Sequence, residues 1–306
     1  MSRIIVLTST LILLTLLCNA QGNVLDGAYA RENQVLRPTI PLQAIRESDA
    51  MYSKKVLRCL DLNEKRNHPL YFPIDDIDYP AAEGLQPKRS RLSLASLVFR
   101  AAYPTDEYGN LKNVGRLVYK PASEQDFEGL TQWWRTPVSD SSDLVGVFNI
   151  MKKTVVTLDL GLPTEHDTVI YVPSRIAPKD VKSIYMWEEW VFDKQRSVMD
   201  VRIIALLFSV SYEGYENEVL RFWINFEDYK DLFATHEVFN QSGNDGARLS
   251  YFDLFQKRLF SSFIVAESNV YDNRMIKDYL MGIEAIREGE RIQGVLADYE
   301  HDQWEY

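Results

Sequence analysis

Three segments in the last third of the sequence constrain the fold most strongly. They are SIYMWEEWVFD at 183–193, SVMDVRIIALLFSV at 197–210 and EVLRFWINF at 218–226. Each is a short run rich in β-branched and aromatic residues, and the third alternates its side chains with a period of two. We therefore expect an antiparallel three-stranded meander whose first turn carries the sequence DKQR.

Charged residues inside these apolar segments need partners or water. On an extended chain Glu188 and Glu189 point to opposite faces, so they cannot act together as a close carboxylate pair. Arg202 needs a carboxylate, either Asp200 on its own strand face or Glu189 across the hairpin. We expect these residues to fix strand register or an assembly contact. The candidate structural or assembly residues are Glu188, Glu189, Trp190, Asp193, Lys194, Arg196 and Arg202.

The first 20 residues have the pattern of a secretory signal peptide. Arg3 precedes an apolar run over 4–17, and small residues surround Ala20. That run is shorter than the roughly 20 residues of a membrane-spanning helix, and no later run is longer. Lipidation of Cys18 is the alternative, but the bulky residue before it disfavours a lipoprotein signal. We expect an exported chain without a membrane span.

The sequence after residue 20 predicts an extended arm over 21–41, followed by a helix and a loop over 42–87. Apolar residues at spacings of three, four or seven favour a helix from about 42 to 63, and HPLYFP ends it. Cys59 lies on this apolar stripe, which favours a buried packing cysteine over a nucleophile served by His68. Loss of Cys18 with the leader leaves Cys59 alone, so no internal disulfide can form.

Region 88–180 is predicted to be rich in β-structure. Ser90 is the expected N-cap of a short helix, and strands follow in GRLVYK, LVGVFNI, TVVTLDL and TVIYV. Region 181–306 holds the meander and the C-terminal helices. Ser250 and Asp253 predict a capping box for a helix that reaches about residue 264.

We expect Asp272 to cap a last helix, broken or kinked at Gly282, Gly289 or Gly294. The predicted fold class is α+β, with a central mixed or antiparallel sheet, an N-terminal helix and C-terminal helices.

Charge and motif content exclude several function classes. The formal charge is −10, or −11 once Arg3 leaves with the signal peptide, which disfavours nucleic acid as a partner. The four histidines are at least 65 positions apart, and no phosphate-binding, dinucleotide-binding or nucleophile-elbow motif occurs. We therefore expect no catalytic residue, no cofactor and no metal.

Two other functions stay open at this point. A glycan-acting hydrolase would use Glu188, Glu189 and Asp193 as acid or base. A glycan- or peptide-binding module would use Trp133, Trp134 and Arg135.

Several long phrases resemble the GldN (PorN) family, which comprises gliding-motility and type IX secretion proteins of Gram-negative bacteria. They are RESDAMYSKKVLRCLDLNEKRNHPLYFP, EEWVFDKQRSVMDVRIIAL, LRFWINF, DLFQKRLFSSFIVAESNVYD and DYEHDQWEY, and they span nearly the whole mature chain.

The resemblance implies an exported, non-enzymatic scaffold. It also implies a homo-oligomeric ring at the periplasmic side of the outer membrane, built with the lipoprotein GldK (PorK). A further implied partner is the periplasmic part of the motor protein GldM (PorM). The family brings no catalytic motif to carry over to particular residues.

Overall fold

The computed structural model describes residues 39–73, 92–104, 111, 114–121, 134, 136–158, 166–211, 219–241, 248–270 and 274–302, with the backbone alone at 152–158 and 166–169. The expected signal peptide and the arm up to residue 38 lie outside these residues, and so do Ser90 and Asp272. Among the described residues, no helix is long and apolar enough to cross a membrane.

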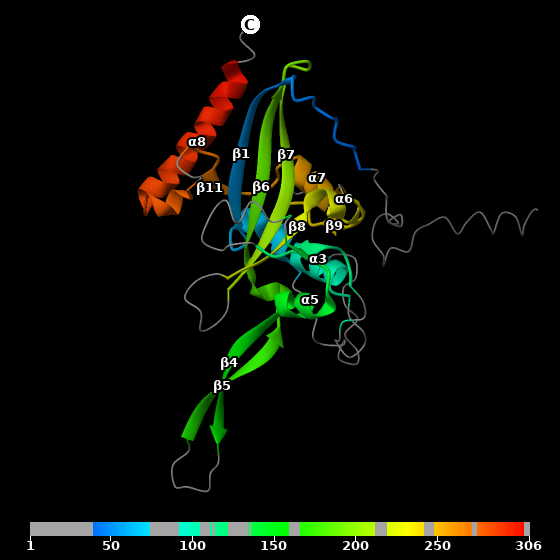
Figure 1. Cartoon of the computed structure of the whole chain (residues 1–306), viewed down its shortest axis with the longest axis vertical. Helices are drawn as coiled ribbons and strands as arrows, with labels where there is room; N and C mark the ends of the chain where they lie inside the picture. The colour runs from blue at the N-terminus through cyan, green and yellow to red at the C-terminus, as the bar shows by residue number, and fades with distance from the viewer. Residues whose placement is uncertain are drawn as a thin grey trace, which may run out of the picture. The chain divides into compact units, whose positions relative to one another are not determined.

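An antiparallel sheet of seven strands forms the centre of the fold, in the order β11-β1-β6-β7-β8-β2-β3 (Figure 1). The predicted meander is confirmed, because β6 pairs with β7 and β7 with β8, and Lys194–Ser197 form the first turn. The strands are β1 Ala50–Asp61, β2 Val118–Tyr119, β3 Pro137–Val138, β6 Val181–Asp193, β7 Val198–Val210, β8 Val219–Asn225 and β11 Phe263–Glu267.

The helix predicted from 42 to 63 is wrong, because most of that segment is the strand β1. It lies between β6 and β11 and pairs with both. All residues from Val56 to Leu60 are buried, since both faces of the strand are covered there. A strand that is buried on both faces loses its alternation, so its apolar spacing resembles that of a buried helix.

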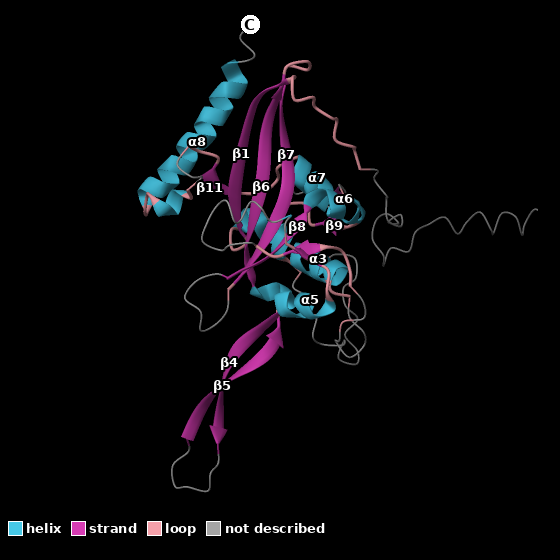
Figure 2. Cartoon of the chain, viewed as in Figure 1, coloured by secondary structure: helices cyan, strands magenta, loops and turns pink. Residues whose placement is uncertain are grey.

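Four helices share the main apolar core with one face of the sheet. They are α3 Leu94–Ala102, α5 Ser141–Phe148, α6 Phe226–Thr235 and α7 Tyr251–Gln256 (Figure 2). The N-cap of α3 is Ser93, whose hydroxyl accepts from the Ser96 amide. The strand predicted in LVGVFNI is wrong over 144–148, because these residues complete α5, and β4 begins only at Asn149.

The capping box of Ser250 and Asp253 is confirmed at the start of α7. The helix ends at Gln256, however, and Arg258 takes a positive φ of 52°. Phe263 and Ile264, predicted to continue this helix, belong instead to β11 at the edge of the sheet. Strand pairing with β1 therefore outweighs the helical spacing of these apolar residues.

The last helix, α8, spans Ile283–Asp302. It begins after Gly282, whose φ of 62° is left-handed, whereas Gly289 and Gly294 lie inside the helix. Of the three positions expected to interrupt it, only Gly282 does so. Ile292 and Leu296 of α8 pack with Val56 of β1 and Ile264 of β11 in a second apolar cluster.

A separate hairpin joins β4 Asn149–Leu158 to β5 His166–Arg175. These strands pair with each other in their own two-stranded sheet (Figure 1). The remaining short elements are α2 His68–Tyr71, β9 Glu237–Val238, β10 Leu249–Ser250 and the 3₁₀ turns η3 Lys65–Asn67, η5 Pro178–Asp180 and η6 Ile276–Asp278. The α+β class is confirmed.

Candidate functional site

The structure places six of the seven candidate residues of the β6–β7 hairpin in two groups. Glu188 and Trp190 join a buried charge cluster on one face of β6. Asp193, Lys194, Arg196 and Arg202 gather at the β6–β7 turn. Glu189 belongs to neither group, since it is only partly buried and accepts a hydrogen bond from the Ser53 hydroxyl at 3.0 Å. The predicted separation of the two glutamates onto opposite faces agrees with these contacts.

Glu188 is the centre of the charge cluster and is 0% exposed. Arg58 Nε of β1 donates to its Oε2 at 2.9 Å, and Arg258 Nη2, just after α7, donates to Oε1 at 2.7 Å. Trp190 Nε1 also donates to Oε2, at 3.2 Å. Both carboxylate oxygens are thus held by fixed donors, which suits a buried anion that ties three elements together.

Trp190 contributes its ring to the same charge cluster. The guanidinium carbons of Arg58 and Arg258 lie 5.9 and 5.8 Å from its ring centroid, within cation–π range. Burial lowers the pKa of Arg58, and the charge of Glu188 opposes that shift. Arginine stays protonated even so, and the cluster carries two cations against one anion.

The β6–β7 turn holds a second, more exposed network. Arg196 Nε donates to Asp193 Oδ2 at 2.7 Å, and this hydrogen bond lowers the pKa of Asp193. Arg202 Nη2 and Nε donate to Asp200 Oδ2 at 2.9 and 3.1 Å. Of the two partners proposed for Arg202, Asp200 is therefore the one it bonds, although Glu189 lies directly opposite in the register.

The same turn is tied to the residues that precede β1. The exposed Lys194 donates its backbone N–H to the Asp49 carbonyl at 2.9 Å. Gln195 Nε2 donates to Asp49 Oδ2, also at 2.9 Å. These contacts hold the residues before β1 beside the β6–β7 turn.

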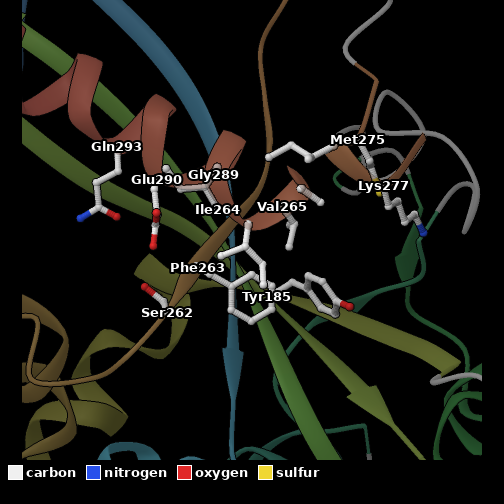
Figure 3. A pocket seen from close by; sticks show the side chains of 13 residues that line it. Tyr185, Ser262, Phe263, Ile264, Val265, Met275, Lys277, Gly289, Glu290 and Gln293 are labelled. Carbon is white, nitrogen blue, oxygen red and sulfur yellow. The ribbon is translucent and has the colours of Figure 1, made fainter. Parts of the chain in front are cut away.

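A groove of about 570 Å³ lies beside the charge cluster, along β11 (Figure 3). We call it the β11 groove; β11, η6 and the first half of α8 form its walls. Its lining includes the apolar side chains of Phe263, Val265, Met275, Ile276 and Ile286. Ser262 and Gln293 also line it, and both accept from Arg58 Nη1, at 3.5 and 3.3 Å. The charge cluster therefore borders one end of the groove.

Comparison with known families decides what this chain is related to. The profile of the family described as gliding motility associated protein GldN matches residues 45–305. The chain belongs to the GldN family. The match covers the sheet, the charge cluster and the β11 groove alike. No curated protein matches the chain.

Sequence reasoning missed two members of the charge cluster in this GldN-family chain. Arg58 stands within VLRCL, and the argument that gave Arg202 a carboxylate partner applies equally to it. In the incorrect helix from about 42 to 63, Arg58 lay outside the apolar stripe, so no partner was predicted for it. Arg258 offered no comparable signal, because its contact with Glu188 depends on how the chain leaves α7.

Three further expectations for this GldN-family chain concern a metal site, Cys59 and a binding module. Within the described ranges, no group of three or more His, Cys, Asp or Glu residues is placed to hold a metal. Cys59 is buried, as its place on the apolar stripe predicted. Trp134 is exposed, whereas Trp133 and Arg135 lie outside the described residues, so the binding module stays a prediction.

Proposed function

We propose that this GldN-family chain is a structural subunit of the type IX secretion and gliding-motility machine. It assembles with an outer-membrane lipoprotein of the GldK (PorK) type into a ring at the periplasmic face of the outer membrane. It also contacts the periplasmic part of a GldM (PorM)-type motor protein. The family match over residues 45–305 carries this proposal, and the signal-peptide pattern of residues 1–20 supports export.

The contacts of the acidic residues favour a scaffold over a hydrolase. A general acid or base must reach the proton that it transfers. Glu188 is fully buried and accepts hydrogen bonds at both carboxylate oxygens. Asp193 accepts a hydrogen bond from Arg196. Glu189 accepts a hydrogen bond from the Ser53 hydroxyl and lies away from Glu188 and Asp193. We therefore propose that the chain acts by assembly and performs no catalysis.

Co-purification with the lipoprotein tests the function. The mature chain is expressed alone and together with the GldK-type lipoprotein, and both samples are viewed by electron microscopy. We expect large ring-shaped particles that contain both proteins in the co-expressed sample. Small monodisperse species in both samples would contradict the proposal.

Cell fractionation tests the location. We expect the chain in the periplasmic fraction without the lipoprotein and with the outer membrane when the lipoprotein is present. Retention in the cytoplasm would contradict export.

A further inference from the structure

A second pocket, of about 690 Å³, lies just beyond the end of β1, and we call it the basic pocket. The turn η3 and the helix α2 form one wall, and the residues that follow β9 form the other. Its lining residues are Lys65, Arg66, His68, Pro69, Phe72, Phe239 and Gln241. Among the described residues, no acidic side chain lines it. The basic pocket therefore combines positive charge with aromatic rings.

The two cations of the basic pocket are available to a ligand. Lys65 and Arg66 are both exposed, and neither side chain forms an ion pair with another residue that the structure describes. The acid that precedes them, Glu64, does not line the pocket, and Glu237 of β9 pairs with Arg248. The positive charge is thus not neutralised within the described part of the chain, and it favours an anionic ligand.

The rings of the basic pocket favour a ligand with an aromatic side chain. Phe72 is 48% exposed and Phe239 is 46% exposed. The ring of His68 packs edge-on against Phe72, with 5.5 Å between the centroids. Gln241 Nε2 donates to the Lys65 carbonyl at 2.8 Å, which ties the two walls of the pocket together. An acidic peptide with an aromatic anchor therefore matches both features of the pocket.

The C-terminal segment of the chain, DYEHDQWEY at 298–306, has this chemistry. Its acids are Asp298, Glu300, Asp302 and Glu305, and it contains no lysine or arginine. The first three of these acids are exposed at the end of α8. Trp304 stands two residues past that helix, outside the described residues. Acids therefore stand on both sides of one large aromatic residue.

The basic pocket and the end of α8 belong to opposite ends of β1. The Tyr299 ring of α8 stacks on Tyr52 near the start of β1, with 4.2 Å between the centroids (Figure 1). At the other end, Asn67 Nδ2 of η3 donates to the Asp61 carbonyl at 2.7 Å. The nine residues of strand from Tyr52 to Asp61 span about 30 Å. The backbone of Trp304 reaches only about 7 Å beyond α8, so another copy must bring it to the pocket.

We infer that the C-terminal segment of one copy binds in the basic pocket of the next copy. Trp304 packs against the two exposed phenylalanine rings, and the flanking acids face Lys65 and Arg66. The two surfaces differ, so each copy offers a free segment at one end of β1 and a free pocket at the other. Such head-to-tail contacts repeat, and they form a closed ring when the rotation between copies closes. This inference rests on the proposed ring and assigns a contact between its copies.

Binding of a labelled peptide to the mature chain tests the contact. The peptide has the sequence of residues 298–306 with fluorescein at its N-terminus, and fluorescence anisotropy measures the dissociation constant. We expect saturable binding that weakens at high salt. Lys65→Glu with Arg66→Glu in the chain should weaken it at least about tenfold, because the acids of the peptide then meet like charges. Trp304→Ala in the peptide should weaken it similarly and leaves the folded chain untouched.

The matched control for the pocket variant is Lys277→Glu with Arg287→Glu. Both residues are exposed and lie outside the basic pocket, and the change in net charge is the same. We expect a dissociation constant within about twofold of the natural chain, since the effect of a distant charge is screened. Equal weakening by both pairs would overturn the inference, because the peptide would then respond to net charge alone. Lack of saturable binding to the natural chain would overturn it too.

Cysteine cross-linking tests the same contact in the assembled particles. Chains with Gln303→Cys and chains with Gln241→Cys carry different tags and are co-expressed with the GldK-type lipoprotein. Mild oxidation is expected to give a covalent dimer that holds both tags. Replacing Gln241→Cys by Lys277→Cys is the control and should give less than about one tenth of that product, because a disulfide requires close Cα atoms. The natural chain measures the background from Cys59, which is buried.

The outcomes separate this inference from the proposed function. Rings without the Gln303–Gln241 cross-link would overturn the inference and leave the function standing. A chain that carries both cysteines and links them internally would also overturn it, because the segment would then occupy its own pocket. Displacement of the labelled peptide by the lipoprotein would assign the pocket to the lipoprotein instead. Cross-linked oligomers without rings would support the contact and contradict the ring.

Discussion

At the scale of single residues, the protein uses one buried carboxylate to join distant parts of the chain. Glu188 of β6 accepts from Arg58 of β1 and from Arg258 after α7. A buried pair of this kind adds little net stability over an apolar equivalent, yet removing one partner is costly because the other charge stays buried. We propose that Glu188 contributes specificity, by fixing where β1 and the end of α7 lie.

Glu188→Gln is expected to lower the free energy of unfolding by about 3 kcal/mol, because two arginine side chains lose their counter-charge. The value is at the low end for buried pairs, since Arg258 keeps some contact with water. Urea unfolding followed by tryptophan fluorescence measures the change.

Glu189→Gln is the matched control for that substitution. Its carboxylate is partly exposed and, among the described residues, accepts a hydrogen bond from the Ser53 hydroxyl, so the free energy of unfolding should fall by less than about 1 kcal/mol. Equal losses at the two positions would show that the buried charge cluster has no special role in stability.

The turn residue Asp193 predicts a contribution to stability that depends on pH. The hydrogen bond from Arg196 lowers the pKa of Asp193, so its folded value lies below the unfolded one. The ionised form therefore stabilises the fold at neutral pH, and this contribution is lost as the pH falls below the usual value of 3.8. The difference in Tm between the natural chain and Asp193→Asn should close in that acid range.

Calorimetry at a series of pH values checks this expectation. Between pH 5 and pH 7 the two Tm values should differ by a constant amount, because Asp193 is ionised throughout in both states. A difference that widens as acid is added would contradict the sign.

At the scale of secondary-structure elements, two glycines of α8 form a natural comparison. A Cβ added at Gly294 meets no atom within 4 Å, so Gly294→Ala should raise the free energy of unfolding by up to about 1 kcal/mol through helix propensity. Gly289→Ala places Cβ 2.9 Å from the Ile264 backbone oxygen. Overpacking costs about 1–3 kcal/mol, which exceeds the gain in propensity, so a net loss is expected.

Chemical unfolding of the two glycine variants compares their free energies of unfolding and so tests how closely α8 packs against β11 at Gly289. Similar gains for both would mean that the helix moves away from the strand without cost.

The elements that could be predicted from the sequence are those whose signal is local. Alternation and turn chemistry identify the β6–β7–β8 meander, and the spacing of Ser250 and Asp253 identifies the start of α7. The Asp200–Arg202 pair is equally local, because both residues stand on one strand face.

The elements that were assigned wrongly depend on partners far away in the chain. β1 is a strand because β6 and β11 flank it, and nothing within residues 50–61 shows that both of its faces are covered. The same holds for β11, whose Phe263 and Ile264 continue the apolar spacing of α7. The β11 groove depends on both elements and could not be predicted before they were placed.

At the scale of the whole molecule, a few charged residues lie within the apolar core, and several apolar residues are exposed. Charged residues sit inside, around Glu188, while apolar residues lie outside on the hairpin and beside the β11 groove. The inner charges hold the sheet edge and α8 in one arrangement, since Arg58 also reaches Gln293. The charge cluster thereby helps to maintain the shape of the β11 groove.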